Sequence, residues 1–107
     1  MTMEAYIQAI LSENPNFVND MNKRVTEEYA EQISETKAVY ETRIESARQS
    51  WLKNQGDTAY EAHKESIAQH IADSIPRYAY IKHIALGGDV FDVEIDLLHG
   101  TWTISPV

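Results

Sequence analysis

The chain contains neither glycine nor proline between Pro15 and Gly56, and apolar side chains recur throughout this stretch. They lie three or four residues apart, with a mean of about 3.67, which is the period of one long and nearly straight α-helix. Asn14 and Pro15 provide a start, because asparagine caps helices and proline fits the first helical position. The sequence therefore predicts a helix over residues 15–55. Its apolar stripe comprises Val18, Met21, Val25, Tyr29, Ile33, Thr36, Tyr40, Ile44, Ala47 and Trp51.

Such a helix is too long for a compact chain of 107 residues. At the rise of an α-helix it would extend over roughly 57 Å, about twice the width of a globule of this size. It must therefore bend, with a kink near Thr36 that forms a hairpin, or protrude and have its stripe covered by another chain. We favour a homodimer that forms through the stripe. The residues expected at this oligomer interface are Tyr29, Ile33, Tyr40, Ile44 and Trp51.

Shorter helical segments are predicted on either side of the long helix. Residues 1–13 form an amphipathic helix that Thr2 can cap. Residues 57–86 carry apolar side chains at helical spacing, and Pro76 interrupts them. Because proline disfavours helical geometry in the residue before it, we expect a break at Ile75 and then a second short helix over residues 77–86.

The C-terminal residues 89–107 change to a period of two, which indicates β-strands. Phe91, Val93, Ile95 and Leu97 alternate with acidic residues. A second run begins at Trp102, and a two-residue turn at His99–Gly100 would place Leu97 opposite Trp102. The expected fold is α+β and mainly helical. It is a single domain with one long helix, shorter helices and a C-terminal antiparallel β-hairpin.

Cysteine content and charge limit the classes of function. The chain has no cysteine, so disulfides and thiolate sites are excluded and a reducing, cytoplasmic location is expected. No apolar run is long enough to span a membrane, and residues 1–13 lack the features of a signal peptide. The formal charge of −8 argues against direct binding of nucleic acid, which needs a basic surface. It favours a protein partner that is itself basic.

Acidic side chains fall in two rows, each of which is either a binding face or simply a solvated surface. The C-terminal row lies in a stretch, from residue 87 onward, that contains no lysine or arginine. The helical row has a spacing of four, at which like charges oppose helix formation. The C-terminal row comprises Asp89, Asp92, Glu94 and Asp96, and the helical row comprises Glu27, Glu31 and Glu35.

No nucleophile motif, glycine-rich phosphate loop or zinc-binding pattern occurs in the chain. His63 and His70 lie seven residues apart, which is not the spacing of zinc ligands on a helix. Asp92 and Glu94 are expected to point into solvent, where burial cannot tune them for acid–base catalysis. We therefore expect no enzymatic activity, no catalytic residue, no metal site and no cofactor.

The run from Ile71 to Tyr78 reads Ile-Ala-Asp-Ser-Ile-Pro-Arg-Tyr and precedes an apolar segment and the acidic C-terminal row. It resembles a stretch in small phage proteins, including DNA-mimicking antirestriction inhibitors, whose pattern is Ala-Asp-x-x-Val-Pro-x-Tyr. This chain has one residue fewer between Asp73 and Pro76. Phage-encoded anti-CRISPR proteins are similar in being short, acidic, cysteine-free and without enzyme motifs. The resemblance implies inhibition by binding, in which an acidic surface occupies the basic channel of a defence complex in the host cytoplasm.

Three functions therefore remain open. The first is a non-enzymatic phage-type inhibitor, anti-CRISPR or antirestriction, that binds a basic protein surface through its acidic rows. The second is a structural, assembly or adaptor protein that oligomerises through its long helix. The third is an oligomeric sponge for a small signalling nucleotide, with a local basic site. The residues that would form this basic site are Lys53, Lys64, Arg77 and Lys82.

Overall fold

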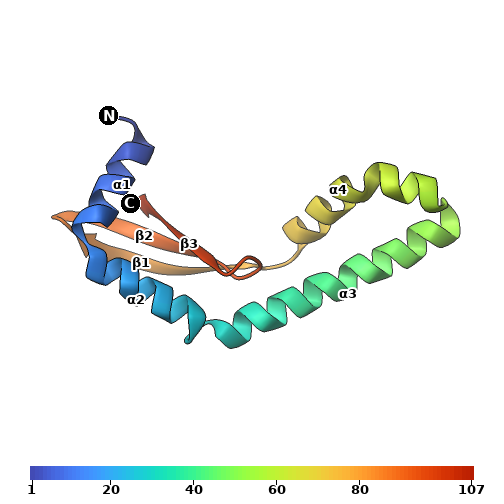
Figure 1. Ribbon diagram of the computed structural model, residues 1–107, viewed down its shortest axis with the longest axis horizontal. Helices are drawn as coiled ribbons and strands as arrows, with labels where there is room; N and C mark the ends of the chain where they lie inside the picture. The colour runs from blue at the N-terminus through green and yellow to red at the C-terminus, as the bar shows by residue number, and fades with distance from the viewer.

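A three-stranded sheet with two helices occupies one end of the molecule, and a helical hairpin projects toward the other end (Figure 1). The computed structural model describes all of residues 1–107. Its radius of gyration is 18.1 Å, whereas about 13 Å is expected for a compact chain of this length. The prediction of an α+β, mainly helical fold is confirmed. The elements are α1 (Met3–Glu13), α2 (Pro15–Thr26), α3 (Ala30–Asn54), α4 (Asp57–Ser74), β1 (Tyr78–Leu86), β2 (Asp89–Asp96) and β3 (Thr101–Pro106).

The sheet buries one face against α1 and α2. Phe91, Val93 and Ile95 of β2 are fully buried on this face, because alternate residues of a strand point to the same side. Met21 of α2 is also fully buried, and Ile10 of α1 belongs to the same apolar cluster. The central strand therefore carries the core, and the strand predicted from alternation in this region is confirmed.

The strand β1 corrects the prediction of a helix over residues 77–86. Residues Tyr78–Leu86 pair antiparallel with β2, so the sheet has the order β1-β2-β3 and is more than a hairpin. The register shifts between Ile81 and Ile84, where a β-bulge places His83 at a φ of 59°. The bulge brings Ile81 and Ile84 to the same face at a spacing of three. This spacing is what resembled the period of a helix.

A four-residue turn, Leu97–Gly100, joins β2 to β3 in place of the expected two-residue turn. Ile95 lies opposite Trp102, so the register differs by two residues from the predicted pairing of Leu97 with Trp102. The same side chains still face the core, because a shift of two residues keeps each one on its side of the sheet. Leu97 joins the core of the sheet, and Leu98 lines the junction with the hairpin.

The prediction of one continuous helix over residues 15–55 is wrong, because two helices meet at a bend. The first, α2, ends at Thr26, and Glu27–Tyr29 form a turn before α3 begins at Ala30. The chain changes direction here and leaves the sheet (Figure 1). The bend thus lies ahead of Thr36, the position where a kink was considered.

The charges around this bend agree with two helices rather than one. A helix dipole favours basic residues at the C-terminus of a helix and acidic residues at the N-terminus. Lys23 and Arg24 lie in the last turn of α2, and Glu31 lies in the first turn of α3. The carbonyl of Arg24 accepts the N–H of Tyr29 at 2.9 Å, so the turn retains a backbone hydrogen bond.

The helices α3 and α4 form a hairpin whose connection turns at Gly56. Gly56 has a φ of 93°, and its N–H donates to the carbonyl of Trp51 at 2.9 Å. Glycine ends the preceding helix here, because it adopts a positive φ without steric strain. At the other end of α4, Ile75 is extended ahead of Pro76, as predicted.

The predicted caps of the first two helices are confirmed in part. The Oγ1 atom of Thr2 accepts the N–H of Ala5 at 3.1 Å and caps α1. Pro15 begins α2, where its missing N–H is not needed. Asn14 does not cap α2, because its Nδ2 donates to the carbonyl of Ile10 at 2.7 Å and closes the end of α1. None of the four helices has the length and apolar character needed to cross a bilayer.

Candidate functional site

The predicted acidic row is divided between the two faces of the sheet, with Asp92, Glu94 and Asp96 on the outer face and Asp89 on the side of α1. Most of these carboxylates are bound within the chain. Asp92 lies beside the bulge of β1. Its Oδ1 accepts the N–H of His83 at 3.0 Å, and its Oδ2 accepts a hydrogen bond from Lys82 Nζ at 3.4 Å. The backbone hydrogen bond from His83, aided by Lys82, lowers the pKa of Asp92. Asp92 is therefore the side chain that closes the bulge.

Asp96 organises the turn between β2 and β3. Its Oδ1 accepts the N–H groups of Leu98 at 3.0 Å and of His99 at 3.2 Å, and its Oδ2 lies 2.6 Å from His99 Nδ1. Burial by itself raises the pKa of Asp96, but the hydrogen bonds from the His99 ring and from the two backbone groups outweigh it. The pKa of Asp96 consequently lies below its ordinary value.

The remaining acids of this row differ from each other. Asp89 accepts a hydrogen bond from the hydroxyl of Tyr6, which ties the start of β2 to α1 and raises the pKa of Tyr6. Glu94 is half-buried between Tyr80 and Thr103 of the neighbouring strands, and its carboxylate accepts no hydrogen bond from the chain. Only Glu94 of the four is free to contact a partner.

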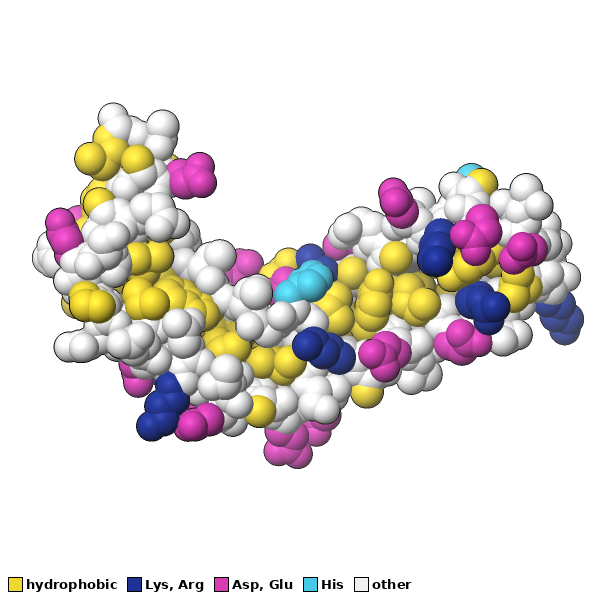
Figure 2. Space-filling model, in the orientation of Figure 1, with side chains coloured by type: hydrophobic (Ala, Val, Ile, Leu, Met, Phe, Trp, Pro, Cys, Tyr) yellow, Lys and Arg dark blue, Asp and Glu magenta, His cyan; other side chains and the backbone are white.

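The helical acids Glu27, Glu31 and Glu35 lie at the bend between α2 and α3, and we call them the elbow glutamates. All three are exposed, and none forms a hydrogen bond or ion pair through its side chain. Their neighbour Glu28 differs, because it pairs with Arg24 Nε at 2.8 Å. Figure 2 shows acidic side chains projecting from the outer side of this bend. The elbow glutamates are thus the unpaired carboxylates that stand together on the surface.

The apolar stripe of the predicted long helix is covered from within the chain. Tyr29 and Ile33 pack against the core of the sheet, and beyond Thr36 the helix runs beside α4. Trp51 contacts the imidazole of His63, with ring centroids 5.2 Å apart. The five residues predicted at an oligomer interface are all half-buried by this internal packing. They are Tyr29, Ile33, Tyr40, Ile44 and Trp51.

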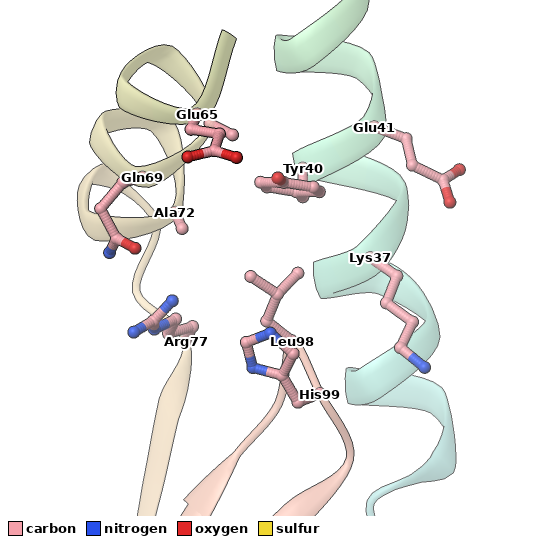
Figure 3. Close-up of a pocket in the computed structure, with 10 residues that line it drawn as sticks. Lys37, Tyr40, Glu41, Glu65, Gln69, Ala72, Arg77, Leu98 and His99 are labelled. Carbon is pink, nitrogen blue, oxygen red and sulfur yellow. The ribbon is translucent and has the colours of Figure 1, made fainter.

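A cavity of about 410 Å³ lies where the hairpin meets the turn between β2 and β3 (Figure 3). Tyr40 and Glu65 face each other across it from α3 and α4, and Arg77 lies at its base. Lys37 and Glu41, which also border it, point outward from α3. The cavity therefore has an aromatic wall with one carboxylate and one guanidinium directed into it.

The four basic residues considered for a nucleotide site do not form one cluster. Arg77 borders the junction cavity, where its Nη2 donates to the hydroxyl of Tyr78 at 2.6 Å. Lys82 lies on β1 and contacts Asp92. The other two, Lys53 and Lys64, lie in the distal half of the hairpin. A site for a phosphate group would have to use these residues separately.

Histidines and carboxylates are similarly dispersed. No group of three or more such side chains is close enough to hold a metal ion. His99 lies in the turn, as predicted, and is held there by Asp96. His63 and His70 border a second cavity, on the hairpin beside Trp51.

Comparison with known proteins identifies no relative of this chain. No family model, no curated protein and no solved structure matches the chain. The proposals below therefore rest on the residues and contacts described above.

Proposed function

We propose that the protein is a non-enzymatic inhibitor that binds a basic surface of a nucleic-acid-targeting defence complex, of the anti-CRISPR or antirestriction type. The proposal rests on which carboxylates have a hydrogen-bond partner within the chain and which do not. The elbow glutamates are exposed and have no partner in the chain, whereas Asp89, Asp92 and Asp96 are engaged in internal hydrogen bonds. The contact surface is therefore the elbow rather than the strand row.

The physical basis of this binding is charge complementarity. The chain carries a formal charge of −8, so its field attracts a lysine- and arginine-rich channel and repels nucleic acid. At the elbow, Glu31 and Glu35 are one helical turn apart, so both can contact one basic groove. Unpaired carboxylates are the ones that can exchange water for a partner's guanidinium without breaking a bond inside the chain.

The experiment is a phage-plating assay in bacteria that carry individual CRISPR or restriction systems and express this chain. Wild type should restore plating against at least one system. The variant Glu27→Lys, Glu31→Lys, Glu35→Lys should lose this effect by about tenfold or more, because like charges then face the basic target. The matched control reverses three other exposed, unpaired acids of the chain. These are Glu4, Glu13 and Glu61.

If the control variant loses as much of the plating effect as the elbow variant, inhibition depends on total charge and not on the elbow glutamates. Full activity of the elbow variant would refute the elbow as contact surface, and absence of protection by wild type against every system would refute the inhibitor. The strand row needs a different test, because reversing Asp92 or Asp96 would disturb the bulge or the turn. Glu94→Lys alone tests that face, and we expect it to leave inhibition unchanged.

A structural or adaptor role is the second candidate, and the shape of the chain favours it. The molecule measures 56 × 32 × 18 Å, and its hairpin projects from the sheet. A projecting pair of helices can present a binding surface at a distance from the sheet. An adaptor should still bind its partner protein in the elbow variant, and it should lose this binding when the hairpin surface is altered.

A further inference from the structure

One flank of the hairpin carries almost no charge. Its centre is a cavity of about 380 Å³ lined by small, apolar and imidazole side chains, without aspartate, glutamate, lysine or arginine. The opposite flank, at the junction cavity, is bordered by Lys37, Glu41, Glu65 and Arg77. We call the uncharged side the neutral flank. The residues at its centre are Ala47, Trp51, His63, Ser66, Ile67, His70 and Ile71.

Helical spacing extends the neutral flank along α3. Residues three or four apart share a face of a helix, so Val39, Arg43 and Ser50 lie on the same side as Ala47. Val39 is 42% exposed on this side of α3. The charged residues on or beside this face are Glu35, four residues before Val39, Asp73, three residues after His70, and Arg43, whose Nη1 donates to Ser74 Oγ at 3.3 Å. About a quarter of the chain is charged, so this paucity of charge is a local property of the flank.

We propose that the neutral flank binds a second copy of this chain, so that two hairpins form a four-helix arrangement. Two molecules that each carry a formal charge of −8 repel one another. They approach most closely where the facing surfaces bear no net charge. Contact between two neutral flanks buries Val39 and the exposed part of Trp51 where charged side chains are few.

The charges of α3 select an antiparallel arrangement. The first half of α3 has three glutamates and one lysine, and the second half has two arginines, one lysine and one glutamate. The two halves therefore carry opposite net charge. A two-fold axis near the middle of the helix places the negative half of one copy beside the positive half of the other, and it makes the interface self-complementary.

The size of the flank is adequate for a pair. The shorter helix, α4, has 18 residues and is therefore about 27 Å long. Two adjacent helices are about 20 Å wide, which gives a flat footprint of roughly 500 Å² per copy before the relief of the side chains is counted. Specific interfaces bury about 800 Å² per partner, so the contact lies in the range of a reversible dimer.

Light scattering and sedimentation equilibrium from micromolar to millimolar protein test this pairing. Wild type should approach twice its monomer mass of 12.2 kDa. Ser50→Glu and, separately, Ser66→Glu should raise the dimer Kd by about 100-fold, because each buries an unpaired carboxylate in the contact on both copies. Ser34→Glu is the control, since Ser34 lies on the opposite side of α3, and it should not change the Kd. Circular dichroism should show that all variants keep their helices.

A wild type that remains at 12.2 kDa at every concentration would overturn the proposal, and so would a dimer that survives both flank variants. The direction of pairing has its own test, because the chain lacks cysteine and accepts a single spin label at Gln55→Cys. Antiparallel copies place the two tips about 40 Å apart, whereas a separation below about 20 Å would mean parallel hairpins. This pairing does not depend on the proposed inhibitory function.

Discussion

Replacing Asp96 by alanine should destabilise the protein more than any other change of a surface carboxylate in the sheet. The change removes Oδ1, which accepts the backbone N–H groups of both Leu98 and His99, and the contact of Oδ2 with the His99 ring. The N–H groups left without a partner belong to the turn that inserts Leu97 and Leu98 into buried positions. Loss of the carboxylate therefore disturbs both the sheet and its junction with the hairpin.

The magnitude follows from the hydrogen bonds and the exposure of Asp96. A hydrogen bond to a charged acceptor contributes about 1.5–3 kcal/mol when it is well shielded from water. The side chain of Asp96 keeps 19% of its accessible surface, and water can replace part of each bond. We therefore expect the free energy of unfolding to fall by about 2 kcal/mol in Asp96→Ala, which corresponds to a fall of roughly 1–1.5 M in the urea midpoint.

Urea unfolding followed by circular dichroism measures this loss, and Glu94→Ala is the matched control. Glu94 lies two residues away on the same strand and the same face, but it has no hydrogen-bond partner in the chain. Its removal should change the free energy of unfolding by no more than about 0.5 kcal/mol. If Asp96→Ala and Glu94→Ala lower the free energy of unfolding equally, the carboxylate of Asp96 does not organise the turn.

Acidification provides a second check on Asp96. Its pKa in the folded chain lies below the ordinary value of 3.8, so folding favours the charged form. The stabilisation is complete above that ordinary value, and it is lost as the pH falls through the lower pKa of the folded state. The difference in stability between wild type and Asp96→Ala should therefore be constant near neutral pH and shrink below about pH 4. A difference that grows on acidification would refute this reasoning.

Three further changes test the sheet. Phe91→Ala opens a cavity at a fully buried position and should lower the free energy of unfolding by about 3–5 kcal/mol, as measured by urea titration. Asp92→Ala should speed hydrogen exchange at the His83 amide, because this N–H then loses its acceptor, and the midpoint of thermal unfolding should fall. Gly100→Ala should cost about 1–2 kcal/mol through its φ of 69° alone, since an added Cβ would lie 3.8 Å from Ile33, and Gly100→Asn should cost less.

Patterns that depend on neighbouring residues were sufficient to predict much of the fold. The break at Ile75 follows from the steric effect of Pro76, and the cap at Thr2 follows from its hydroxyl. The strand through Phe91 follows from strict alternation, because one of its faces is buried and the other is wet. These features need no knowledge of the remaining chain.

Features that depend on the rest of the chain were predicted incorrectly. The apolar stripe passes through the bend at Glu27–Tyr29 without a change of period, because it packs first on the sheet and then on α4. The break was visible only in the charges, as basic residues that end one helix and acidic residues that begin the next. In β1, the bulge at His83 altered the spacing of the isoleucines and concealed a strand.

The difference between aspartate and glutamate indicates which carboxylates bind backbone N–H groups, whereas the spacing of the acids does not. Asp92 and Asp96 stand where the sheet is irregular, at the bulge and at the turn, and there backbone N–H groups lack a strand partner. The short side chain of aspartate reaches such nearby N–H groups, which is why it favours turns. Glu94, between them, lies in regular pairing and binds nothing. Among the elbow acids, Glu31 and Glu35 lie on the surface of α3 and Glu27 in the turn before it. All three are left for solvent or for a partner, whereas the adjacent Glu28 pairs with Arg24.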